Sequence, residues 1–172
     1  MRLPLFVLLT TALGIAGAHA SAFEVLGFAQ GMSLAEARSM ALRNGYRIEK
    51  ESSDAQGVYI VAGHHLEDFR IQFCEDELHW VTYRAGSGFV DFVKAVESAK
   101  ASSNYKELSS DLAYRIDDNG KDEALLTVSL APKEGDYFLS YSLRGTSEEG
   151  TPDFMVTYRA IRLMLSVLRG GC

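Results

Sequence analysis

Residues 112–130, with the sequence LAYRIDDNGKDEALLTVSL, contain the strongest folding signal in the chain. Residues 112–116 and 124–130 are rich in aliphatic and β-prone side chains. Between them lies Asn119-Gly120, and both residues of such a pair readily adopt the positive φ angles of a tight hairpin turn. This stretch therefore predicts an antiparallel β-hairpin.

Further strands are predicted on both sides of this hairpin. Residues 133–136 (KEGD) form a second turn signal and lead into an expected strand over residues 137–143. Upstream, three β-branched or aromatic runs predict strands over residues 57–62, 69–73 and 80–83. Residues 74–78 would connect the last two of these runs as a hairpin. The predicted sheet is therefore mainly antiparallel.

Two amphipathic helices are predicted before and between these strands. Ser33 and Glu36 have the spacing of a capping box, and the Ala-rich helix that follows would end at Gly45. A second helix is expected after Gly88, because apolar residues then recur every three or four positions. These residues are Phe89, Phe92, Val93 and Val96.

A third helix is predicted near the C-terminus. Thr151 is a good N-cap, Pro152 suits the first helical position, and Asp153 complements the helix dipole. Apolar residues then recur at spacings of four and three, and Gly170 would end the helix. Residues 154–158 are also β-prone, so a strand is the competing interpretation.

The order helix, strands, helix, strands, helix defines the expected fold class. It is an α+β fold with a mainly antiparallel sheet and about three helices. Residues 31–53 and 88–110 align loosely, because each contains a helix, then a tyrosine, then a Ser-Ser pair. This similarity favours two loosely related helix-plus-hairpin units, although the residue identity between them is low.

Residues 1–20 have the pattern of a secretory signal peptide. Arg2 gives a positive start, residues 3–16 are apolar apart from two threonines, and Ala18-His19-Ala20 is a small-x-small cleavage site. An uncleaved membrane anchor is the alternative. We expect residues 21–172 to form one globular α+β domain in the periplasm, without a membrane anchor after cleavage.

The charge of the chain limits its partners. The sequence has 17 basic and 23 acidic residues, and removal of the signal, which contains Arg2, leaves 16 basic residues and a net charge of −7. The basic residues form no stripe, which argues against nucleic-acid binding. A basic protein surface is the partner that this charge favours.

No recognisable catalytic constellation is present. The sequence lacks a G-x-S-x-G elbow, an H-E-x-x-H motif, a phosphate-binding glycine loop and a paired C-x-x-C site. The mature chain has three histidines, His64, His65 and His79, whose positions favour a turn pair and a strand residue over a metal site. We therefore expect a protein that is not an enzyme and that uses no cofactor and no metal.

The two cysteines, Cys74 and Cys172, are expected to form a disulfide in an oxidising compartment. Gly170-Gly171 would act as a flexible tether and allow Cys172 to meet the strict geometry of that bond. The alternative is a buried thiol at Cys74 and a terminal thiol at Cys172.

Residues 104–111 (NYKELSSD) are the best candidate for a binding loop. They lie between the second predicted helix and the next strand, and combine an aromatic ring, charges of both signs and two hydroxyls. Small hydroxyl residues at a loop tip can enter a narrow cleft and hydrogen-bond a catalytic histidine. The alternative is an ordinary connection whose serines bond to local backbone groups.

The chain resembles the periplasmic immunity proteins that protect a bacterium from peptidoglycan amidases delivered by type VI secretion. The resemblance is to the partner of a papain-like Cys/His amidase. The matching features are the signal ending in Ala18-His19-Ala20, the length of 172 residues, the acidic mature chain and residues 106–111. The resemblance implies that the protein binds the amidase, occludes its active site without a covalent step, and protects the producer from self or sibling intoxication.

The resemblance also implies roles for particular residues. Ser109 would insert toward the catalytic histidine of the amidase, with Ser110 beside it. The other expected interface residues are Tyr105, Lys106, Glu107, Leu108, Asp111 and Tyr114.

Two other functions fit the same sequence. One is a periplasmic small-ligand-binding or envelope-assembly module, and the other is a secreted inhibitor of lysozyme or β-lactamase. A pocket with a few convergent polar groups would favour the ligand-binding module. A protruding loop on a flat or convex face would favour an inhibitor.

Overall fold

The structure is a computed structural model that describes residues 22–51, 57–63, 66, 68–116, 122–146 and 152–161. Within these residues there are two helices, α1 (Leu34–Arg43) and α2 (Phe89–Ala101). The strands are β1 (Glu24–Val25), β2 (Phe28–Ala29), β3 (Arg47–Lys50), β4 (Val58–Ala62), β5 (Arg70–Cys74), β6 (Glu77–Ser87), β7 (Tyr105–Ile116), β8 (Asp122–Pro132), β9 (Tyr137–Thr146) and β10 (Asp153–Ala160).

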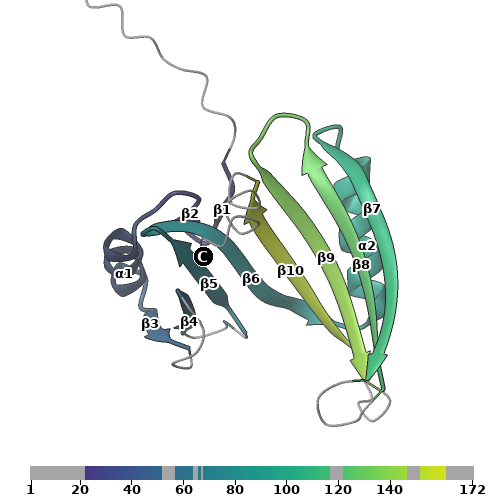
Figure 1. Ribbon diagram of the computed structural model, residues 1–172, viewed down its shortest axis with the longest axis horizontal. Coiled ribbons are helices and arrows are strands. Elements are labelled where there is room, and N and C mark those ends of the chain that lie inside the picture. Colours follow the sequence, from purple (N-terminus) through teal and green to yellow (C-terminus); the bar gives the residue numbers. More distant parts are fainter. Residues whose placement is uncertain are drawn as a thin grey trace, which may run out of the picture.

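Eight of these strands form one antiparallel sheet in the order β3-β4-β5-β6-β10-β9-β8-β7. β1 and β2 pair with each other in a separate small sheet. Helix α1 precedes the run β3 to β6, and α2 precedes the run β7 to β10. The last strands of the two runs, β6 and β10, pair at the centre of the sheet (Figure 1). The short strand β3 and the long strand β7 are therefore its two edges.

Both helices cover one face of the large sheet. In α1, the guanidinium of Arg38 lies over the ring of Tyr59 in β4, 5.9 Å from its centroid. In α2, Phe92 makes an edge-to-face contact with Phe154 in β10, with ring centroids 5.8 Å apart. The register from β4 through β5 and β6 to β10 puts Tyr59 and Phe154 on the same side, because directly paired residues share a face. We call this side the helix face and the opposite side the open face.

The predicted start of α1 is confirmed. The Glu36 backbone amide donates to Ser33 Oγ at 3.3 Å, and the Ser33 backbone amide donates to Glu36 Oε2 at 2.9 Å. Asp76, in the turn between β5 and β6, accepts a further hydrogen bond from the Leu34 amide. The helix ends before Gly45, which has a φ of +77° that favours glycine. Local sequence signals therefore define this helix at both ends.

The predicted second helix is also present, but its apolar stripe is only partly buried. Phe92 and Val96 are buried in the core, whereas Phe89 is 58% exposed. The stripe therefore begins one turn later than the spacing of apolar residues suggests.

The prediction of a third helix is wrong. Asp153–Ala160 form β10, which lies between β6 and β9 in the middle of the sheet. Phe154, Val156 and Ala160 are buried, and the alternation of two matches a strand. A central strand bonds to a neighbour on each side and packs its β-prone residues against the core, which outweighs the local capping signals at its start.

The expected fold class is corrected accordingly. The fold is α+β, but the described residues contain two helices rather than about three, and they are mostly strand. Each helix is followed by four strands rather than by one hairpin. Residues 105–111 are not a loop, because β7 begins at Tyr105.

The three predicted hairpins are confirmed, and the one expected at residues 74–78 joins β5 to β6. Strands β7 and β8 pair as far as Ile116 and Asp122, so they form the hairpin predicted around Asn119-Gly120; the turn itself, residues 117–121, lies outside the described residues. Residues 133–136 connect β8 to β9.

The predicted signal peptide, residues 1–20, lies outside the described part of the chain. Among the described residues, no helix is long and apolar enough to cross a membrane.

Candidate functional site: the open face and the edge strand β7

The open face carries a line of hydroxyl side chains across five strands. Each member pairs directly with the next member in the neighbouring strand. From the sheet edge inward they are Ser109 in β7, Ser129 in β8, Ser140 in β9, Thr157 in β10 and Thr82 in β6. We call these five residues the hydroxyl row. Thr157 is three positions from the core residue Phe154 in β10, so the row points away from the helices.

Hydrogen bonds connect members of the row. Ser129 Oγ lies 3.3 Å from Ser140 Oγ, and Thr157 Oγ1 lies 2.9 Å from Thr82 Oγ1. The Thr82 hydroxyl also lies 3.2 Å from the carbonyl oxygen of Val156. Each hydroxyl can donate and accept, so the row offers an uncharged surface that suits partners with either kind of group.

The row changes from buried to exposed along its length. Thr82 is only 6% exposed at the centre of the sheet, the middle members are half-buried, and Ser109 at the edge is exposed. Beside the row, Asp111 pairs directly with Thr127, and the Thr127 hydroxyl lies 3.3 Å from Ser142 Oγ. The accessible end of this polar surface is therefore at β7.

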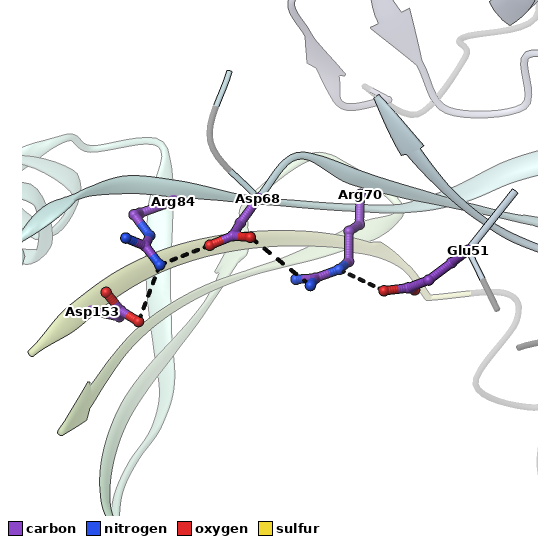
Figure 2. Close-up of polar contacts among 5 residues, drawn as sticks. All are labelled: Glu51, Asp68, Arg70, Arg84 and Asp153. Carbon is purple, nitrogen blue, oxygen red and sulfur yellow. Dashed lines mark hydrogen bonds and ion pairs between the residues drawn. The ribbon is translucent and has the colours of Figure 1, made fainter. Parts of the chain in front are cut away.

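The inner end of the row meets a chain of ion pairs. Its members are Glu51, Arg70, Asp68, Arg84 and Asp153 (Figure 2). Arg70 lies 3.0 Å from Glu51 and 4.0 Å from Asp68, while Arg84 lies 2.8 Å from Asp68 and 3.3 Å from Asp153. Arg84 belongs to β6 and Asp153 to β10, so this chain crosses the junction between the two four-stranded runs. All five side chains are partly exposed, so solvent weakens each pair.

Ser109 occupies an irregular point of the edge strand. The register of β7 against β8 shifts between Glu107 and Ser109, which leaves Leu108 as the extra residue of a β-bulge. A bulge bends its strand and re-aims the neighbouring side chains. Ser109 is therefore an exposed hydroxyl next to a bend, but it lies in a strand and not at the tip of a loop.

Ser110 points away from Ser109. Ser110 pairs directly with Val128, which is buried on the helix face, whereas Ser109 pairs with Ser129 on the open face. Successive residues of a strand point to opposite faces. The two serines therefore cannot enter one narrow cleft side by side, and this part of the expected arrangement is corrected.

The remaining predicted interface residues have different environments. The Tyr105 hydroxyl lies 3.2 Å from that of Tyr137, and Tyr105 packs on the core, so it supports the fold. Glu107 is held 2.8 Å from Lys100 at the end of α2. Lys106, Leu108, Asp111 and Tyr114 are exposed. Five of the six, Glu107 included, are therefore exposed, and Tyr105 is half-buried.

An apolar stripe continues from this site toward the end of β7. Leu112 is 77% exposed, Tyr114 68% and Ile116 65%, and all three lie on the helix face because they alternate with Asp111. Of these three residues, only Tyr114 was among the expected interface residues. The signal that would have identified the stripe is the apolar alternation of residues 112–116, once β7 is known to be an edge.

A separate groove lies on the helix face beside α2. It has a volume of about 380 Å³, and its lining includes Lys94 and the tyrosines Tyr83, Tyr141 and Tyr158. Burial raises the pKa of Tyr141 to about 12 and also raises the pKa of Tyr83 and Tyr158. These phenols therefore stay protonated and act as neutral hydrogen-bonding groups at physiological pH.

Of the two cysteines in the predicted disulfide, Cys74 lies among the described residues. Cys74 is buried and disulfide-bonded. Cys172 lies outside the described residues, so its pairing with Cys74 stays a prediction.

Of the three histidines considered as metal ligands, His64 and His65 lie outside the described residues, and His79 is buried in β6. In the described part of the chain, no three His, Cys, Asp or Glu residues are grouped as metal ligands would be.

No protein-family model matches the sequence, and no curated protein matches it. Among solved structures, the chain is similar to the solution structure of cyanobacterial PsbP (CyanoP) from Synechocystis sp. PCC 6803. The two are 14% identical, the match covers 73% of this chain and 76% of that chain, and the TM-score is 0.34. A likeness at this level supports no conclusion about function.

Proposed function

We propose that this chain is a periplasmic immunity protein that binds a type VI-secreted peptidoglycan amidase and blocks its active site. The observation that carries the proposal is the position of Ser109. It is an exposed hydroxyl at a β-bulge in an edge strand, at the accessible end of the hydroxyl row. The identity of the partner rests on the sequence resemblance described above.

The chemistry of Ser109 suits a non-covalent block. A serine hydroxyl can donate to or accept from the ring nitrogen of a catalytic histidine, as its protonation requires. Asp111, two residues further on the same face, adds a negative charge beside the hydroxyl. The partner's histidine is then occupied by a hydrogen bond, and substrate is kept out by the bulk of the strand.

Two serines cannot supply the area of a stable interface, which is roughly 1,600 Å² in total for a standard complex. The exposed apolar residues of β7 are the best anchors for the rest. Leu108 is 47% exposed at the bulge, and Leu112 and Tyr114 are more exposed still. Aromatic and large apolar residues commonly dominate such interfaces. The mature chain's net negative charge would speed association with a basic amidase.

The test is a titration of a type VI-secreted, papain-like amidase with mature protein, residues 21–172, with peptidoglycan hydrolysis as the readout. Wild type should abolish activity at one equivalent. Ser109→Arg should weaken inhibition at least about tenfold, because a long cation replaces the small hydroxyl at the bulge. Ser110→Arg is the matched control on the opposite face and should change inhibition much less.

Two results would count against the proposal. One is full amidase activity with excess wild-type protein. The other is equal loss of inhibition in the Ser109→Arg and Ser110→Arg proteins, which would show that the open-face hydroxyl has no special role.

The groove beside α2 favours a second candidate function, a periplasmic ligand-binding module. Three tyrosines and Lys94 converge on a cavity of about 380 Å³, a size that suits a small ligand. Native mass spectrometry of protein purified from the periplasm tests this function. A bound small molecule that is lost in a Tyr158→Trp variant would favour the ligand-binding module over the inhibitor.

A further inference from the structure

A second line of side chains crosses the open face next to the hydroxyl row. Arg159 in β10 pairs directly with Trp80 in β6 on one side and with Phe138 in β9 on the other. Directly paired residues share a face, and Arg159 follows Thr157 by two positions, so all three side chains project from the open face. We call Trp80, Arg159 and Phe138 the aromatic–arginine row.

The charge of Arg159 has no partner within the described part of the chain. Two other arginines of the open face are held by carboxylates, because Arg70 lies 3.0 Å from Glu51 and Arg84 lies 2.8 Å from Asp68. Arg159 forms no ion pair with a described residue, and its Nε atom is buried without a hydrogen-bond partner there. A partly buried cation without a partner costs free energy. An anion from outside the chain would remove this cost.

The two rings beside Arg159 favour an anion with an apolar part. Trp80 and Phe138 are both half-buried, so each still presents part of its ring to solvent. A ligand can therefore lay an apolar group on one ring while its charged group reaches the guanidinium between them. The planar fork of an arginine matches the two oxygens of a carboxylate. One cation in a chain of net negative charge also suits a singly charged carboxylate better than a phosphate.

We propose that Arg159 binds the carboxylate of a small organic acid whose apolar group packs on Trp80 or Phe138. Thr157 and Ser140 pair with each other two residues along the same strands, and their hydroxyls border the site. A hydroxyl can donate to a ligand oxygen or accept from a ligand N–H. The aromatic–arginine row thus supplies charge and apolar contact, and the hydroxyl row supplies neutral hydrogen bonds beside them.

This carboxylate site is separate from the two sites described above. Strands lie about 4.8 Å apart, so β10 is about 14 Å from β7, and a small ligand on Arg159 does not cover Ser109. Tyr158 in the groove beside α2 adjoins Arg159 in sequence and therefore points to the opposite face. The inference accordingly rests neither on the proposed inhibitor function nor on that groove.

Trp80 is the only tryptophan of the chain, so its fluorescence reports on this site directly. Titration of wild-type protein, residues 21–172, with N-acetylphenylalanine should change this fluorescence in a saturable way. The matching amide, N-acetylphenylalaninamide, keeps the ring but lacks the charge, and should bind at least about tenfold more weakly. Acetate, which has the carboxylate but no ring, should also bind more weakly, because it buries less apolar surface.

Two substitutions test the role of Arg159. Arg159→Met should weaken binding of N-acetylphenylalanine at least about tenfold, to the level of the amide. Arg159→Lys should weaken it less, because lysine keeps the charge but lacks the planar fork. Arg70→Met is the matched control, because it also removes one positive charge from the open face. It should leave binding within about twofold, since Arg70 is two strands away and salt screens its charge.

Circular dichroism checks that each variant is folded. A wild-type protein whose Trp80 fluorescence does not respond to N-acetylphenylalanine would overturn the proposal, as would equal binding of the acid and its amide. These two comparisons need no variant, so they decide the matter even where Arg159→Met fails to fold. A folded Arg159→Met protein that binds the acid as well as wild type, or an equal loss in Arg70→Met, would also overturn it.

Discussion

Ser109 in the edge strand lies directly opposite Ser129, whose hydroxyl is 3.3 Å from that of Ser140. This relationship makes Ser109 the outermost member of a hydroxyl row that reaches the buried Thr82 five strands into the sheet. The exposed residue that we propose as the binding residue is thus attached to a rigid scaffold, which limits the conformations that it can adopt when free. Such preorganisation lowers the entropy that binding would otherwise cost.

The inner end of the row should contribute to stability. Thr82→Val removes a buried hydroxyl that bonds to Thr157 and to the Val156 carbonyl oxygen, while it keeps the side-chain shape. We expect the free energy of unfolding to fall by about 1 kcal/mol, as for the loss of a typical buried hydrogen bond. Urea denaturation measures this change. Thr127→Val, the same substitution at a more exposed site on the open face, is the control and should change stability by less than about 0.5 kcal/mol.

The ion-pair chain should stabilise the junction of β6 and β10. Arg84→Met removes the contacts to Asp68 and Asp153 together and should cost about 1 kcal/mol, because all three side chains are partly exposed and each pair is screened. The cost should shrink in high salt, since salt screens the pairs of the wild type. The control is Arg47→Met, which removes a 3.9 Å pair with Glu49 on the exposed edge. Equal losses in the two variants would show that the chain has no special role at the junction.

His79 should make the fold sensitive to mild acid. Burial lowers the pKa of His79 below its ordinary value of 6.5, and Arg159 acts in the same direction, while a hydrogen bond with the Glu77 backbone opposes them. The unfolded chain then binds a proton that the folded chain does not, so stability falls as pH drops below about 6.5. His79→Leu should lose less stability than wild type between about pH 7 and 5. Parallel pH profiles of the two proteins in chemical denaturation would contradict this assignment.

The tyrosines should set the alkaline limit. Burial raises the pKa of Tyr137, Tyr141 and Tyr158 above the ordinary value of 10, with Tyr141 at about 12. Above about pH 10 the unfolded chain loses these protons first, so stability falls as pH rises further. The ultraviolet absorbance of tyrosinate should therefore rise in two stages, the later one together with loss of circular dichroism. A single early stage in the folded protein would show that these phenols are accessible to water.

Local signals predicted the elements whose determinants lie close together in the chain. The capping box of Ser33 and Glu36 is made by residues three positions apart, and it starts α1 as expected. The turn over residues 133–136 and the hairpin of β7 and β8 are formed by segments that adjoin in sequence. Such contacts close short loops, so the sequence around them already contains the necessary information.

The last strand shows where local information fails. Thr151, Pro152 and Asp153 have the chemistry of a helix start, yet Asp153–Ala160 form β10. Its partners are β6 and β9, and the pairing with β6 brings together residues about seventy positions apart, such as Thr82 and Thr157. The competing β propensity of residues 154–158 was visible in the sequence, but only the neighbouring strands decide between the two.

Some properties of the candidate site were likewise visible in the sequence, and others depend on the tertiary structure. The sequence by itself determined the composition of residues 105–111, with two hydroxyls, charges of both signs and apolar neighbours, and it determined the hairpin that begins there. Only the tertiary structure decided that this segment is an edge strand, that Ser109 and Ser110 point to opposite faces, and that Ser109 ends a row of hydroxyls. The physical reason is that a side chain's face in a sheet depends on register, and register is set by pairing with strands that the local sequence does not contain.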